Sequence, residues 1–323
     1  MLFRSDWQIE GTCDALLTTI REKANPIRVG VNIGSSEIQI GVVNEQNHLL
    51  DVKKYPTQPK RPAQEIIEET AENILKMLAE NNIPLEQCVG VGGGVPGTID
   101  RSKGTVIYSN NIRWEDVQLT KTLGEVIPCP VRIANDADCA ALGEAVAGAG
   151  KNFSDVVMFT MGNGVGGGII LNGEVFEGGI MGGSEVGHQV IRVNGRLCSC
   201  GRKGCLEAYV SVPALLKAAR QVAGKDLTLD EIFTLAKNED VAMTEVVEQY
   251  TLMLGQGIVN IVNMFRPQLI LLGGAMSTYA KDLIEPLIDI LTEDCFGGVH
   301  APIPKIAIAE LGSNAGMIGA ANL

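Results

Sequence analysis

The sequence predicts an α/β protein made of two domains that face each other across a cleft. Its 323 residues, 46% hydrophobic and 20% charged, are enough for about two globular domains of roughly 150 residues each. One order of elements, βββαβαβα, occurs twice along the chain. Each copy can bury its own core. Each copy also offers a strand-turn-strand loop of small residues, so we expect the two loops to share one ligand.

The first copy opens with three β-rich runs between residues 27 and 55, separated by turn-forming residues at 34–36 and 44–47. Apolar residues then recur at helical spacing from Ala63 to Asn82, and Pro84 lies just beyond them. The remaining expected elements are a strand at 88–93, a loop at 94–100, a strand at 105–109, a helix near 116–126 and a strand at 131–134.

The second copy opens with another strand meander at 155–176, whose first turn is rich in glycine. The expected elements after it are helices near 211–222, 229–237 and 241–265, a strand at 268–274, a helix near 279–293, a strand at 305–309 and a helix from about Asn314. We divide the chain into an N-terminal extension (1–26), a smaller α/β domain (27–127 plus 303–323) and a larger α/β domain (128–302).

Composition excludes several classes of protein. The formal net charge of −12 has the wrong sign for a protein that neutralises nucleic-acid phosphates. The first residues lack a secretory signal pattern, and nowhere do about 18 apolar residues run together. We therefore expect a soluble cytoplasmic protein that binds neither nucleic acid nor membrane. Five cysteines stand alone among apolar neighbours, as buried reduced thiols do: Cys13, Cys88, Cys129, Cys139 and Cys295.

The glycine-rich turn Gly162-Asn163-Gly164-Val165-Gly166-Gly167 matches G-x-G-x-x-G. A dinucleotide-binding loop needs a helix after the glycines, whereas here a second strand follows, so the glycines close a hairpin. Backbone N–H groups in such a turn can approach an anion closely, since no Cβ intervenes. The alternative is a tight turn without a ligand. No G-x-x-x-x-G-K-[ST] motif occurs, which argues against a P-loop NTPase.

His188, Cys198, Cys200 and Cys205 form a compact cluster in the sequence. A C-x-C-x4-C set with a nearby histidine supplies the four nitrogen and sulfur ligands of tetrahedral zinc. Four protein ligands leave no open position, so the expected Zn²⁺ is structural. The alternatives are a disulfide, which a reducing compartment disfavours, or three unrelated buried thiols.

Seven motifs in the same order resemble those of the ROK family of bacterial sugar kinases and sugar-responsive repressors, most closely its glucokinases. They are GVPGTID (94–100), ANDADCAALGE (134–144), TMGNGVGGGIILNG (160–173), GGSEVGH (182–188), CSCGRKGCLE (198–207), LILLGGAMS (269–277) and AELGSNAGMIGAA (309–321). The resemblance runs from about residue 27 to the C-terminus. It implies the actin-like ATPase fold shared with hexokinases, in agreement with the duplicated pattern.

By this resemblance Asp136 is the catalytic base, because phosphoryl transfer needs a carboxylate that accepts the proton of the attacking hydroxyl group. The alternative is that Asp136 only caps the helix expected at 136–147. The resemblance assigns the sugar to Gly97, Asn110, Asn111, Asn135, Asp136, Glu185, His188 and Glu207. It assigns the nucleotide to Gly34, Ser35, Ser36, Gly162, Asn163, Gly164, Gly273 and Gly274. Glu185 and Glu207 could instead be solvated carboxylates, and His188 a zinc ligand alone.

The first phosphate loop departs from the family pattern, D-[IL]-G-G-T-[KN]. Here the chain reads Asn32-Ile33-Gly34-Ser35-Ser36-Glu37. Asn32 lacks the charge that would support Mg²⁺ or its waters, and Glu37 places a negative charge near the phosphates. Weakened catalysis, an altered nucleotide preference, or sugar binding without catalysis would each follow from these changes.

We expect a kinase that uses ATP with Mg²⁺ to phosphorylate a hexose, glucose first. The alternatives are N-acetylmannosamine, allose, fructose or a β-glucoside as substrate, or a sugar-binding or regulatory protein with reduced catalysis. The 26 residues before the first strand are too few for the winged-helix domain of the family's repressors. The expected assembly is a homo-oligomer, a dimer or tetramer. The extension carries a short amphipathic pattern at Cys13, Leu16, Leu17 and Ile20.

Overall fold

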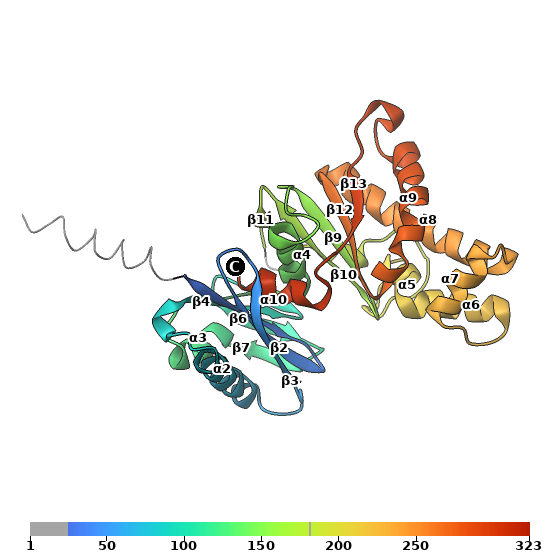
Figure 1. The fold of residues 1–323 in the computed structure, drawn as a ribbon. Coiled ribbons are helices and arrows are strands. Elements are labelled where there is room, and N and C mark those ends of the chain that lie inside the picture. Colours follow the sequence, from blue (N-terminus) through green and yellow to red (C-terminus); the bar gives the residue numbers. More distant parts are fainter. Residues whose placement is uncertain (1–24, 181) are drawn as a thin grey trace, which may run out of the picture.

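The computed structural model describes residues 25–180 and 182–323. The amphipathic pattern expected between Cys13 and Ile20 lies outside the described residues. Two five-stranded sheets dominate the described part, with strand orders β3-β2-β1-β4-β8 and β11-β10-β9-β12-β13. The two orders are equivalent position by position, so the predicted duplication is confirmed. Figure 1 shows the two sheets in separate halves of the molecule, with α4 and α10 between them.

The first sheet is covered on one face by a long amphipathic helix. Val29, Val31 and Ile33 alternate along β1 and pack against the buried face of α2 (Ala63–Glu80). Ala79, which continues the helical spacing of the apolar residues predicted between Ala63 and Asn82, is exposed instead. The strands of this half are β1 (Ile27–Ile33), β2 (Glu37–Val43), β3 (Leu49–Pro56), β4 (Cys88–Val95) and β8 (Val131–Asn135).

A small antiparallel sheet lies in the chain between β4 and β8. It consists of β5 (Thr98–Asp100), β6 (Thr105–Ser109) and β7 (Trp114–Val117), and α3 (Leu119–Val126) follows. The sequence placed a loop over β5 and began the helix near residue 116, which was wrong at both points. Trp114 is buried in the core and pairs with Ser109, so tertiary packing extends the strand into the predicted helix.

The second sheet has the same order, but helices are inserted after its meander. Its strands are β9 (Val156–Met161), β10 (Val165–Leu171), β11 (Glu174–Val175), β12 (Leu269–Gly274) and β13 (Lys305–Ile308). The helices of this half are α5 (Glu207–Val210), α6 (Val212–Ala223), α7 (Leu229–Lys237), α8 (Val241–Phe265) and α9 (Ala280–Asp294). The buried face of α8 packs with β9 and β12 in one apolar core.

Two helices cross between the halves. Helix α4 (Asp136–Ala147) follows β8 of the first sheet but packs on β10, whereas α10 (Ala315–Ala320) follows β13 of the second sheet but packs on β1 and β4. They meet so closely that a Cβ at Gly319 would lie 1.7 Å from the carbonyl oxygen of Cys139. Only glycine permits this approach. The chain therefore passes twice between the halves through tightly packed helices.

The predicted domain boundaries need two corrections. The sequence assigned residues 128–302 to the larger domain, but β8 pairs with β4 in the first sheet. The sequence also assigned residues 303–323 to the smaller domain, but β13 pairs with β12 in the second sheet. Both errors arise because α4 and α10 each follow a strand of one sheet and pack on the other sheet. The linear order of elements does not reveal this packing. Within the described residues, no helix is long and apolar enough to span a lipid bilayer.

Candidate active site

Three predicted site segments meet where parallel strands of the first sheet end. Asn32 near the end of β1 pairs with Gly94 of β4, and Val95 at the end of β4 pairs with Asn135 at the end of β8. Ligands of open α/β sheets bind at this carboxyl edge. The first phosphate loop, the loop around Gly97 and the Asn135-Asp136 pair therefore lie at one edge.

Asn135 performs two structural tasks. Its Oδ1 accepts a hydrogen bond from the N–H of Ala137 at 2.9 Å and so caps α4, while its Nδ2 donates to the carbonyl oxygen of Gly97 at 3.1 Å. The N-cap residue is thus Asn135, and Asp136 is the first residue of the helix. The alternative that Asp136 serves as the N-cap is wrong, although its Oδ1 also accepts from Ala137 at 3.0 Å.

The surroundings of Asp136 favour a basic carboxylate. Burial raises the pKa of the Asp136 carboxyl, the N–H groups of Ala137 and of Asp136 itself lower it, and the charge of Glu185 raises it again. The net direction is upward. A carboxylate whose pKa moves toward neutrality accepts a proton more readily at neutral pH.

A cavity of about 380 Å³ opens between the two halves beside Asn135. Gly97 and Asn135 line it from the first half, and Glu185 lines it from the second. Its size lies in the range of small-molecule sites, ~300–1,000 Å³. Three predicted sugar residues from segments far apart in the sequence therefore share one cavity.

A second cavity, of about 1020 Å³, collects other predicted residues. Asn111 lines it from the first half; from the second half come Asn163, Gly164, His188 and Glu207. Glu185, which lines the first cavity, comes directly before the 3-10 helix Val186–His188, and His188 at the end of that helix lines the second cavity. The predicted site residues that line neither of these two cavities are Asp136, Asn110, Gly34, Ser35, Ser36, Gly162, Gly273 and Gly274.

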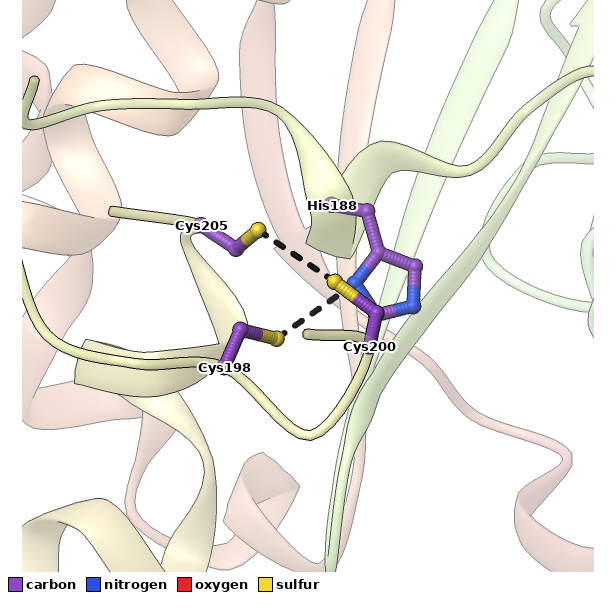
Figure 2. Close-up of side chains that lie close together, drawn as sticks. All are labelled: His188, Cys198, Cys200 and Cys205. Carbon is purple, nitrogen blue, oxygen red and sulfur yellow. Dashed lines mark hydrogen bonds between the residues drawn. The ribbon is translucent and has the colours of Figure 1, made fainter. Parts of the chain in front are cut away.

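The four predicted zinc ligands converge, as Figure 2 shows. The ligand atoms of His188, Cys198, Cys200 and Cys205 all lie within 4.8 Å of one another. Nδ1 of His188 lies 3.7 Å from Sγ of Cys198, and Sγ of Cys200 lies 3.7 Å from Sγ of Cys205. Zinc–sulfur bonds of ~2.3 Å in a tetrahedron separate neighbouring ligand atoms by about 3.8 Å. The spacing of these ligand atoms therefore fits tetrahedral zinc, with Nε2 of His188 on the far side of the ring.

Glu207 joins the cysteine cluster to the glycine-rich hairpin. Its Oε2 accepts a hydrogen bond from the N–H of Val165 at 3.0 Å, and its Oε1 accepts from the hydroxyl group of Ser199 at 2.6 Å. Burial raises the pKa of this carboxyl, but the hydrogen bonds from Ser199 and Val165 outweigh it, so the net pKa is lowered. Glu207 is thus held in place on both oxygens and is not a freely solvated carboxylate.

The two other segments predicted to bind the nucleotide lie side by side in the second sheet. The N–H of Gly162 donates to the carbonyl oxygen of Gly164 at 2.9 Å and closes the turn after β9. Gly274, at the end of β12, pairs with Met161 at the end of β9. The glycine turn and the Gly273-Gly274 pair are therefore neighbours at the edge where parallel strands end.

The first phosphate loop is a turn in which the N–H of Gly34 donates to the carbonyl oxygen of Glu37 at 2.9 Å. Oδ1 of Asn32 is buried and has no hydrogen-bond partner within the described residues. The carboxylate of Glu37 accepts from the amide of Gln39 and lies 3.8 Å from Nζ of Lys54. The charge of Glu37 is therefore partly compensated.

Comparison with known proteins shows the family of the chain. A sequence model of the ROK family matches residues 28–323. The chain belongs to the ROK family. A glucokinase of Halalkalibacterium halodurans is 31% identical over 306 residues, which cover 90% of this chain and 92% of that protein.

Two solved ROK structures are similar over nearly the whole chain. The ROK hexokinase of Thermus thermophilus has a TM-score of 0.80 at 30% identity, and the match covers 91% of this chain and 96% of the hexokinase. The ROK glucokinase of Streptomyces griseus, solved with glucose and AMPPNP, has a TM-score of 0.72 at 30% identity. The match covers 92% of this chain and 98% of that protein. This ROK protein is accordingly a sugar kinase with the actin-like ATPase fold.

Sequence reasoning missed one group of this ROK site. Asp138 lines the first cavity from α4, and an ion pair of 3.0 Å between Arg101 and Glu177 crosses from one half to the other beside it. The available signal was a carboxylate inside the apolar stretch ADCAALG. The Arg101–Glu177 pair left no signal, since exposed charges in loops are common.

Proposed function

We propose that this ROK protein transfers the γ-phosphate of ATP to a hydroxyl group of a hexose, glucose first among them. The placement of Asp136 carries the proposal. Asn135 supplies the helix cap, so Asp136 stands half-buried at the strand edge beside Glu185, with a raised pKa. The glucokinases of H. halodurans and S. griseus support glucose as the substrate.

Asp136 acts as the general base in this proposal. The hydroxyl oxygen of the sugar forms a bond to the γ-phosphorus while the bond from that phosphorus to the bridging oxygen of ADP breaks. The hydroxyl proton passes to the Asp136 carboxylate, which later releases it to water. Burial favours proton uptake by this carboxylate, since it raises the pKa of Asp136.

The sugar contacts Gly97, Asn135 and Glu185 in the first cavity. Asn110 or Asn111, His188 and Glu207 complete the set when the halves close, since both cavities are lined from both halves. Carboxylates and amides discriminate between sugar epimers, because a misplaced hydroxyl group leaves a buried polar atom unpaired.

ATP with Mg²⁺ binds at the glycine turns. The N–H groups of Gly34 and Gly162 close the two turns. Ser35 and Ser36 in one turn and Asn163 and Gly164 in the other offer their backbone N–H groups to phosphate oxygens. Gly273 and Gly274 lie beside the second turn and contact the adenosine.

Zn²⁺ is the structural ion of His188, Cys198, Cys200 and Cys205, whose spacing fits a tetrahedron. Bound there, it supplies a rigid crosslink rather than Lewis-acid chemistry, because all four positions belong to the protein. Thiolate ligands of this kind persist in a reducing compartment, which supports a cytoplasmic location. The homo-oligomer stays a prediction.

A coupled assay of ADP release against a panel of sugars tests the proposal. We expect glucose to give the highest kcat/KM among glucose, N-acetylmannosamine, allose, fructose and a β-glucoside. A different preferred sugar would correct the substrate. No ADP release with any hexose would instead define a sugar-binding relative of the kinases.

A further inference from the structure

Asp138 is a buried carboxyl group that no other part of the described chain satisfies. It lies in the first turn of α4 and is only 5% exposed. Its Oδ1 is buried and has no hydrogen-bond partner within the described residues. An unpaired buried polar atom costs free energy, so each case in a native protein calls for an explanation, such as an absent ligand.

The position of Asp138 is fixed by packing. Strand β10 approaches α4 so closely that a Cβ at Gly168 would lie 2.9 Å from Cα of Asp138 and 2.8 Å from the carbonyl oxygen of Ala137. The backbone of α4 therefore cannot move toward β10 to give the carboxyl group another partner. Asp138 stays on the wall of the first cavity, which it shares with Asn135 and Glu185.

The charged groups around Asp138 come from four segments. The pKa of its carboxyl is raised to about 8, mainly by burial and also by the charges of Glu177, Asp136 and Glu185, while Arg101 lowers it. Asp100 and Lys103 line the same cavity and form an ion pair of 3.2 Å. At neutral pH most Asp138 side chains carry a proton, and a protonated carboxyl group is a hydrogen-bond donor.

We propose that Asp138 is a further sugar-binding residue of this kinase, and that its carboxyl group donates a hydrogen bond to an oxygen of the hexose in the cavity lined by Asn135 and Glu185. The inference rests on the proposed function, since it assigns that cavity to the sugar. A donor on this wall complements the carboxylate of Glu185, which accepts. Asp138 thereby selects sugars that present an acceptor oxygen at this point.

Calorimetric titration of glucose into the full chain without nucleotide tests the inference, because it needs no turnover. Asp138→Ala is expected to raise Kd about tenfold, the loss of one hydrogen bond, with a parallel rise in KM and a smaller change in kcat. Asp138→Asn is expected to bind more tightly than Asp138→Ala, since an amide also donates. Asp226→Asn, the same chemical change at an exposed aspartate, is the matched control and should leave Kd unchanged.

The pH dependence of Kd separates a binding role from a structural one. Wild-type affinity should fall between about pH 7 and pH 9 as Asp138 loses its proton, and this fall should be absent in Asp138→Asn. The isosteric asparagine decides the question even if the alanine variant does not fold. Asp138→Ala with a Kd within about twofold of wild type, or a pH-dependent fall that persists in Asp138→Asn, overturns the inference.

The titration and the coupled assay of ADP release together distinguish this inference from the proposed function. A wild type that binds a hexose through Asp138 but releases no ADP would contradict the kinase proposal alone. A wild type that binds no hexose of the panel would overturn the role of Asp138 as well.

Discussion

Val165 donates its backbone N–H to Oε2 of Glu207 at 3.0 Å, and Glu207 lies two residues after Cys205. The glycine hairpin is thus fastened to the cysteine cluster by one side chain. Ser199, between two of the cysteines, holds the other oxygen of the same carboxylate. Any change in the cluster is therefore expected to reach both the glycine hairpin and His188.

Purified protein should contain about one tightly bound zinc ion per chain. Cys200→Ser should lose the metal and weaken sugar binding, because His188 and Glu207 lose their anchor. Metal analysis and sugar KM are the measurements. Cys295→Ser, at a buried cysteine outside the cluster, should keep the metal. A metal-free wild type with full activity would refute the zinc site.

Asn32→Asp should leave kcat equal or raise it. Oδ1 of Asn32, near the end of β1, is buried and has no hydrogen-bond partner among residues 25–180 and 182–323; a carboxylate there would support Mg²⁺ or its waters. The measurement is kcat as a function of Mg²⁺ concentration for both proteins. A loss of activity in a folded Asn32→Asp variant would show that the amide is required.

The stability of the protein should depend on pH through Asp138. The pKa of this carboxyl rises from 3.8 to about 8 on folding. Between these values the folded chain holds a proton that the unfolded chain has lost, so the free energy of unfolding falls as pH rises through this window. Asp138→Asn removes the effect. Its gain in Tm over wild type should be larger at about pH 8 than at about pH 5. An equal difference at both pH values would argue against a buried titrating Asp138.

Sugar and a non-hydrolysable ATP analogue together should draw the two halves closer. Six of the proposed sugar ligands are divided between two cavities, each lined from both halves, and closure would exclude water from the reacting groups. Small-angle scattering should show a smaller radius of gyration with both ligands than with neither. An unchanged radius at saturating ligand would contradict closure.

Local patterns predicted most elements of the fold. Alternation and turn residues located the two meanders, and helical spacing located α2 and α8, since these signals depend on neighbours in the chain. The sheet membership of β8 and β13 escaped prediction because it depends on α4 and α10 exchanging sides. The strand at Trp114 escaped because tertiary burial outweighs local propensity there.

The residues of the candidate site were likewise predicted only in part. Cysteine spacing with a nearby histidine predicted the four cluster residues, and the structure brings their ligand atoms together. The family resemblance predicted the role of Asp136, which stays a prediction. The cap at Asn135 rather than Asp136 depends on backbone geometry at a single residue. Asp138 escaped notice because its importance comes from burial against β10 and from Glu177, a residue distant in the sequence.

The kinetics of Asp136→Asn test the central claim most directly. The amide keeps the size of the side chain, and Asn135 still caps α4, so the fold, the metal and sugar binding should remain. The measurement is kcat with saturating ATP and the preferred hexose. The account predicts a fall of about 10²- to 10⁴-fold, the usual effect of removing a general base while the positioning groups remain. Turnover of Asp136→Asn at the wild-type rate would contradict it.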